Sequence, residues 1–64
     1  MYVLYMVAIT GYSEVIAVSD DYKKLSRKID NVCSERHFTM MEDWDFITQV
    51  GIKGTFYIEK VEVI

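Results

Sequence analysis

The chain has 64 residues, of which 52% are hydrophobic and 14% aromatic, and its formal net charge is −3. This length allows one domain, residues 1–64, which buries only about 60% of its unfolded surface. The single cysteine excludes an internal disulfide, and Cys33 with His37 falls short of the four ligands that a structural zinc usually takes. Oligomerisation is the remaining source of added stability, so we expect a homodimer.

A mildly acidic chain has no overall attraction for nucleic acid or for an anionic membrane. The longest apolar run, residues 1–9, is far shorter than the ~20 residues that cross a bilayer, and no basic signal-peptide region is visible. An unpaired thiol is typical of a reducing compartment. We therefore expect a cytoplasmic protein with no membrane segment, for which nucleic acid is a disfavoured partner.

Residues 2–18 predict a β-hairpin. Residues 2–9 (YVLYMVAI) are apolar at odd and even positions and rich in β-branched and aromatic side chains. This pattern is typical of a strand covered on both faces. Residues 10–13 have the composition of a turn, in which Gly11 can adopt a positive φ, and residues 14–18 form the returning strand.

The next segment predicts an amphipathic helix that ends near Arg36. Ser19 is a suitable N-cap, and Asp20 and Asp21 would place negative charge in the first turn, beside the positive end of the helix dipole. The apolar positions recur at helical spacing and form one stripe. Its members are Tyr22, Leu25, Ile29, Val32 and Cys33.

The C-terminal half predicts more strands. We interpret residues 37–41 as a short strand or a loop, 45–50 as a strand, 51–54 as a turn and 55–64 as a long final strand. A β-bulge near residues 59–60 would reconcile a change of phase in the last strand. The order is β-β-α-β-β, an α+β fold with one amphipathic helix packed on one face of a small antiparallel sheet. The opposite face then needs another cover, for which a second copy is the simplest candidate.

The stretch EDWDF, residues 42–46, places the only tryptophan among three acids. Tryptophan is a frequent hot spot of protein interfaces, and an acidic rim steers a protein towards a basic surface. The candidate partner-binding residues are therefore Trp44, Phe46, Glu42, Asp43 and Asp45. Alternatively, Trp44 and Phe46 complete a small core, and the sequence leaves both possibilities open.

The same acids are weak candidates for chemistry. A strand would place Asp43 and Asp45 on one side, which offers too few oxygens for calcium and no evident pocket for an acid–base pair. Cys33 and His37 are four residues apart, but they lack the third, orienting group of a catalytic triad. We interpret them as a buried thiol and a histidine at the helix end, and we expect no catalytic residue, metal or cofactor.

Basic residues cluster on the predicted helix as two i,i+4 pairs. They are Lys23, Lys24, Arg27 and Lys28. They are the nucleic-acid-binding candidates of an alternative function, although the solvated face of any amphipathic helix would explain them equally well.

The run IAVSDDYKKLSRKIDNV after a short hairpin resembles small proteins of unknown function that bacteriophages, prophages and their hosts encode. The resemblance covers residues 1–33 and transfers no functional residue. It implies a protein that binds and blocks a host protein, as anti-CRISPR and other counter-defence proteins do. We therefore expect a non-enzymatic protein-binding module, most concretely a phage-type inhibitor that sterically blocks a bacterial defence or nucleic-acid-processing enzyme. The alternative is a small nucleic-acid-binding or regulatory module that uses the basic helix face.

Overall fold

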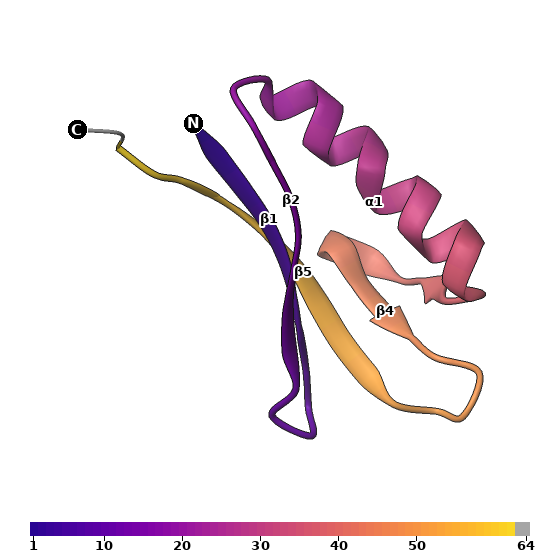
Figure 1. The fold of residues 1–64 in the computed structure, drawn as a ribbon. Coiled ribbons are helices and arrows are strands. Elements are labelled where there is room, and N and C mark those ends of the chain that lie inside the picture. Colours follow the sequence, from indigo (N-terminus) through magenta and orange to yellow (C-terminus); the bar gives the residue numbers. More distant parts are fainter. Residues whose placement is uncertain (63–64) are drawn as a thin grey trace.

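In the computed structural model, which describes residues 1–62, one helix packs on one face of a five-stranded antiparallel sheet (Figure 1). The elements are β1 (Tyr2–Ala8), β2 (Ser13–Ser19), α1 (Tyr22–Arg36), β3 (Thr39–Met40), the 3-10 turn η1 (Glu42–Trp44), β4 (Asp45–Ile47) and β5 (Lys53–Lys60). The strands lie in the order β2-β1-β5-β4-β3. The predicted α+β class is confirmed.

The alternation of side chains along β1 divides the sheet into two faces. Leu4 and Met6 are buried, whereas Val3 and Tyr5 point to the opposite side. The registers Leu4↔Ile58 and Tyr5↔Tyr57 continue this division into β5. We call the side that α1 covers the helix face and the other side the open face.

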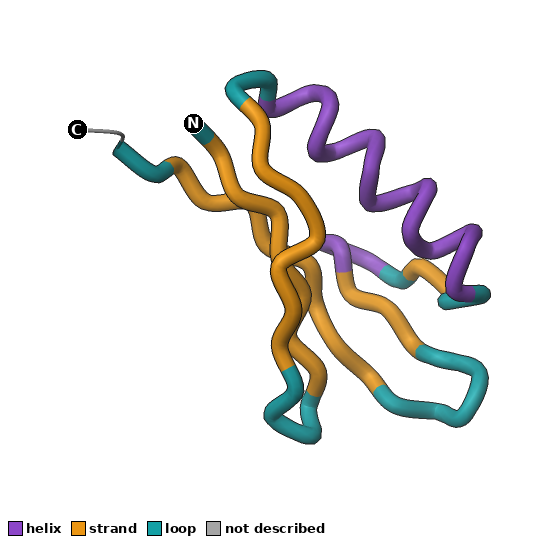
Figure 2. The backbone as a smooth tube through the Cα atoms, in the orientation of Figure 1, coloured by secondary structure: helices purple, strands orange, loops and turns teal. Residues whose placement is uncertain are grey.

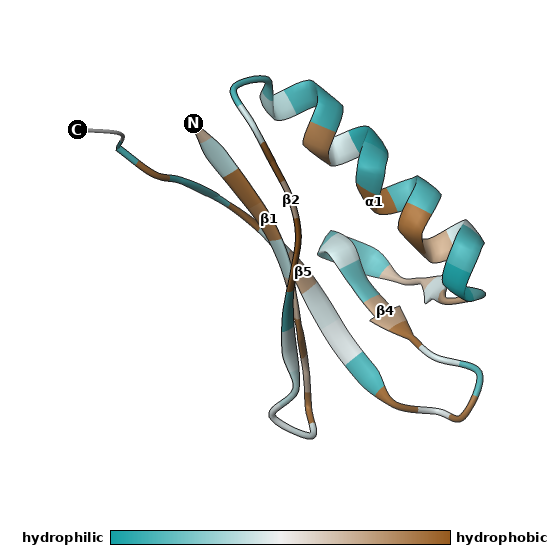
Figure 3. Cartoon of the chain, viewed as in Figure 1, coloured by the Kyte–Doolittle hydropathy of each residue, from teal (hydrophilic) through white to brown (hydrophobic). Residues whose placement is uncertain are grey.

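The core lies between the helix face and α1. Its largest fully buried side chains are Phe46, Phe56, Leu4 and Ile29. The ring of Phe46 is stacked on Phe38 at a centroid distance of 4.8 Å and lies 4.9 Å from the ring of Phe56. The apolar bands of α1 are visible in Figure 3. The predicted helical stripe is confirmed for its four buried members, while its first member, Tyr22, is 44% exposed.

The helix begins later than predicted, because Ser19 still belongs to the sheet. Ser19 is paired with Tyr2, and its Oγ accepts a hydrogen bond from the N–H of Asp21 at 3.0 Å. Asp21 is the N-cap, since its Oδ1 accepts from the N–H of Lys23 at 2.9 Å. Asp20 and Asp21 therefore precede the first turn instead of lying in it. The predicted end at Arg36 is confirmed, and His37 follows it in the left-handed conformation (φ 58°).

The bulge lies in the N-terminal hairpin and not near residues 59–60. The register of β1 with β5 runs without a shift from Ala8↔Gly54 to Tyr2↔Lys60. The register of β1 with β2 shifts at Leu4/Tyr5 and leaves Ile16 unpaired. A bulge there lets Ile16 and its neighbour Ala17 both pack against the core.

The last hairpin turns earlier than predicted. β4 ends at Ile47, and the turn occupies residues 48–52, where Thr48 Oγ1 accepts a hydrogen bond from the N–H of Ile52 at 3.1 Å. Side-chain bonds of this kind compete with the strand ladder. This loop and the loop after β1 lie at the same end of the sheet (Figure 2). β5 ends at Lys60, and residues 63–64 of the predicted final strand lie outside the described residues.

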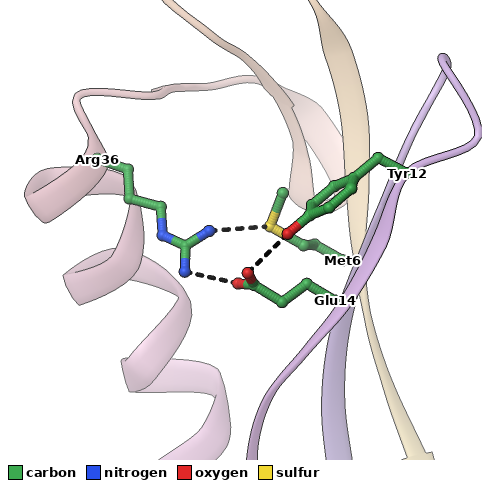
Figure 4. Close-up of polar contacts among 4 residues, drawn as sticks. All are labelled: Met6, Tyr12, Glu14 and Arg36. Carbon is green, nitrogen blue, oxygen red and sulfur yellow. Dashed lines mark hydrogen bonds and ion pairs between the residues drawn. The ribbon is translucent and has the colours of Figure 1, made fainter.

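A polar cluster joins the end of α1 to the first hairpin (Figure 4). Arg36 Nη2 forms an ion pair with Glu14 Oε2 at 2.6 Å, and the hydroxyl of Tyr12 donates to Glu14 Oε1 at 2.8 Å. The other guanidinium nitrogen lies 3.8 Å from the sulfur of Met6. The hydrogen bonds from Tyr12 and then from Arg36 hold the pKa of Glu14 below its ordinary value of 4.5.

We expect this cluster to make stability depend on pH in the acid range. Because the pKa of Glu14 is lowered in the folded state, its contribution is present above the unfolded-state pKa and is lost as the pH falls through the folded-state value. In urea unfolding from neutral pH to about pH 3, the wild type should lose more stability than Glu14→Gln. Glu35→Gln, at an exposed helix position, is the control. Equal losses for Glu14→Gln and the wild type would contradict the expectation.

Gly54 allows Phe46 to pack. A β-carbon at Gly54 would collide with the ring of Phe46 and lie 2.7 Å from the carbonyl oxygen of Val7. Because the ring is fully buried, we expect Gly54→Ala to lower the free energy of unfolding by about 1–3 kcal/mol, measured by urea denaturation. Phe46→Leu in the same chain should recover part of that loss. An unchanged stability of Gly54→Ala would show that the ring moves away freely.

Candidate functional site

Three aromatic side chains meet near the start of α1. The rings of Tyr2 and Tyr22 form an edge contact at 5.5 Å, and the rings of Tyr22 and Trp44 lie 6.4 Å apart in a tilted arrangement. Tyr2 and Trp44 are half-buried against the core, whereas Tyr22 is exposed. We call these three residues the aromatic corner. Rings in such geometries stabilise one another beyond their buried area.

The backbone beneath the corner is left-handed at two successive residues other than glycine. The φ of Asp43 is 53° and that of Trp44 is 63°. This conformation is uncommon for aspartate and an outlier for a bulky residue such as tryptophan. The N–H of Asp45 donates to the carbonyl of Glu42, and the N–H of Met41 donates to the carbonyl of Asp45 at 2.6 Å. Strain of this kind persists where the surrounding structure enforces it, and it gathers at functional sites.

The structure separates the five predicted partner-binding residues. Glu42 and Asp43 are exposed beside the half-buried Trp44. Asp45 begins β4 on the open face, where its Oδ1 accepts a hydrogen bond from Thr55 Oγ1 at 2.7 Å. Phe46 is 0% exposed, so it belongs to the core and not to a binding surface. The strand geometry considered for Asp43 and Asp45 is wrong, because Asp43 lies within η1 and only Asp45 belongs to a strand.

Sequence reasoning missed the two tyrosines of the corner. Tyr22 has the correct spacing for the apolar stripe of the helix, but it stands at the first helical position, beyond the edge of the core. Tyr2 lies at the start of β1. Tyr2 opens a strand and Tyr22 opens the helix. This place at the start of an element was the only feature of the sequence that distinguished the two tyrosines from core residues.

The basic helix residues form a solvent-facing group. Lys23, Lys24 and Arg27 are exposed and Lys28 is half-buried. Among the described residues, the only ion pair is that of Arg36 with Glu14, so none of these four cations is neutralised by a carboxylate contact.

Cys33 and His37 are not brought together as a reactive pair. The thiol is buried in the core, and burial, followed by the charge of Asp30, raises its pKa. A thiol of this kind is less often a thiolate, and therefore less reactive, than an exposed one. The backbone of His37 closes the helix. Within residues 1–62, no three His, Cys, Asp or Glu side chains converge as metal ligands.

A shallow hollow of about 280 Å³ lies between the ends of β1, β4 and β5. Its lining residues are Ile9, Met41, Asp45, Phe46, Lys53, Gly54 and Thr55. The hollow contains one acid and one base at its margin, and it lacks the converging polar groups that fix a small ligand in a binding site.

Comparisons with protein-family models, curated proteins and solved structures found no match to the chain. The helix found in the described residues is not long and apolar enough to cross a membrane.

Proposed function

We propose that the protein is a non-enzymatic protein-binding module that uses the aromatic corner. One observation supports this proposal above the others: Trp44 is held half-exposed, in a strained left-handed conformation, directly after two exposed acids. Trp44 packs against the margin of the core and keeps part of its surface in contact with solvent, whereas Phe46 and Phe56 are 0% and 1% exposed.

The corner has the composition of an interface anchor. Trp44 and Tyr22 offer aromatic area of the kind that dominates binding hot spots. Glu42 and Asp43 supply an acidic rim, which steers association with a basic surface more than it adds affinity. The mechanism is steric, because the module occupies a surface that its partner needs.

The most concrete version is a phage-type inhibitor that blocks a bacterial defence or nucleic-acid-processing enzyme in the host cytoplasm. Two features support it. Residues 1–33 resemble small phage and prophage proteins, and the acidic rim is complementary to the basic grooves with which such enzymes hold nucleic acid.

We expect Trp44→Ala to abolish capture of the partner while the chain stays folded. A tagged protein is incubated with bacterial lysate, the retained proteins are identified by mass spectrometry, and the affinity of the leading partner is then measured with purified protein. Truncation of a hot-spot residue costs 2 kcal/mol or more, so the affinity should fall at least about thirtyfold. Val50→Ala is the matched control, because Val50 is 81% exposed on the β4–β5 loop.

Circular dichroism and urea unfolding of each variant separate binding from folding. Global unfolding of Trp44→Ala would instead assign Trp44 to the core. In that case Glu42→Lys tests the binding role separately from folding, because Glu42 is exposed and does not belong to the core. It should weaken binding at low salt, whereas Glu35→Lys, on the exposed side of α1, should not. Retained binding by both Trp44→Ala and Glu42→Lys would overturn the proposal.

The second candidate is a nucleic-acid-binding module, favoured by the exposed and unpaired Lys23, Lys24 and Arg27. It predicts affinity for generic DNA or RNA that falls steeply with salt, with a slope of about −0.9 for each phosphate contact. Lys24→Glu and Arg27→Glu should each reduce that slope, and the matched change Lys60→Glu, in β5, should not. Fluorescence anisotropy with a labelled oligonucleotide measures this, and no binding at low salt rules the module out.

A further inference from the structure

The open face carries a contiguous apolar patch that no part of the described chain covers. Its members are Val3, Tyr5, Val7, Val15, Val18 and Tyr57. The registers place Val18 beside Val3, and place Val15 and Tyr57 on either side of Tyr5. Val15 is 63% exposed, Val18 55% and Tyr57 43%. We call these six residues the open-face patch.

Two hydroxyls on this face are already hydrogen-bonded within the chain, those of Tyr5 and Thr55. The hydroxyl of Tyr5 donates to Glu59 Oε1 at 2.7 Å, and its ring is stacked on Tyr57 at 5.3 Å. Thr55 Oγ1 donates to Asp45 Oδ1 at 2.7 Å. Burial of a polar group is costly mainly when it loses its partners. This face can therefore be taken out of water against an apolar surface without leaving these hydroxyls unsatisfied.

The open face has the area of a small interface, and the chain as a whole exposes slightly more surface than a compact monomer of its mass. Strands about 4.8 Å apart, with a rise of about 3.3 Å per residue, give the open face of three seven-residue strands an area of roughly 330 Å². The chain exposes 4620 Å², whereas a compact monomer of 7.5 kDa exposes roughly 4,250 Å². Two such faces cover roughly 660 Å² together, which is the size of a weak, transient interface and not of a permanent one. A weak association, formed at high protein concentration, is the corresponding expectation.

We propose that the open-face patch is the interface between two copies of this chain, packed sheet against sheet about a two-fold axis. Three observations favour a second copy over a foreign partner. The centre of the patch is uncharged, and the carboxylate of Glu59, beside Val3, lies at its margin, so the apolar centres of two like faces can meet. It offers no charge of one sign to select another protein. Residues 1–62 also contain neither a disulfide nor a cluster of metal ligands, the features by which other small domains gain stability.

Such a dimer is a sandwich with its sheets about 10 Å apart and a helix on each outer side. The aromatic corner belongs to the helix face, so both corners stay accessible. The dimer proposal does not depend on the proposed function, and either can fail alone.

Sedimentation equilibrium of the purified full-length chain tests the dimer. The expected mass rises from 7.5 kDa towards twice that value between low-micromolar and near-millimolar concentration. Val15→Lys should weaken association at least tenfold while the circular dichroism spectrum stays that of the wild type, because Val15 is 63% exposed in the monomer. Val50→Lys, at a still more exposed valine outside the patch, is the matched control and should associate as the wild type does.

A variant on a different strand distinguishes face packing from pairing of the β2 edges. Tyr57 lies in β5, which β1 separates from β2. Tyr57→Lys should weaken association as Val15→Lys does. Association that Val15→Lys weakens and Tyr57→Lys leaves intact would assign the contact to the β2 edge and overturn the proposal. A wild type that stays monomeric at near-millimolar concentration would overturn it as well.

Discussion

The packing of one helical stripe on one side of a sheet is the contact on which the rest of this structure depends. Leu25, Ile29, Val32 and Cys33 of α1 cover Leu4 and Met6 of β1 together with the aromatic rings of β4 and β5. A helix has a single apolar stripe and a sheet has two faces. Within the described chain, the second face therefore stays uncovered, although β1 is apolar on both sides. The exposed valines of the open face are a direct consequence of this one-sided core.

The same helix explains where the other surface features lie. Its two ends reach beyond the core and are held by different chemistry. At the C-terminal end, Arg36 is paired with Glu14. At the N-terminal end, Tyr22 lies between Tyr2 and Trp44. The aromatic corner thus completes the attachment of the helix and also keeps part of Trp44 in contact with solvent. A residue that helps to fix the helix and still has a free side is well placed to bind a partner rigidly, because little side-chain entropy is left to lose.

Periodicity predicted the helix, the first hairpin and the one-sided architecture, since each extends over several repeats of its pattern. Periodicity could not decide which of two neighbouring residues begins or ends an element. Serine and aspartate are equally good N-caps, and only the pairing of Ser19 with Tyr2 makes Asp21 the cap. β3 and β4 have two and three residues, too few for alternation to be recognised. For the candidate site, no glycine marks the left-handed turn at Asp43 and Trp44, so the turn η1 was not predicted, and the buried Phe46 was grouped with the exposed acids.

The two surfaces differ in the kind of partner that each suits. The open-face patch is apolar, and the hydroxyl of Tyr5 at its centre is already hydrogen-bonded within the chain, as in interfaces that stay buried after assembly. The aromatic corner is small, strained and flanked by negative charge, which suits a positively charged partner that binds to the assembled dimer. They lie on opposite faces of a single sheet, so occupation of one does not block the other. A dimer through the open face would present two aromatic corners, and a target with two matching surfaces within reach would be held more tightly than one corner could hold it. In such a dimer, association through the sheet face that the small core leaves uncovered would place two aromatic corners on one molecule.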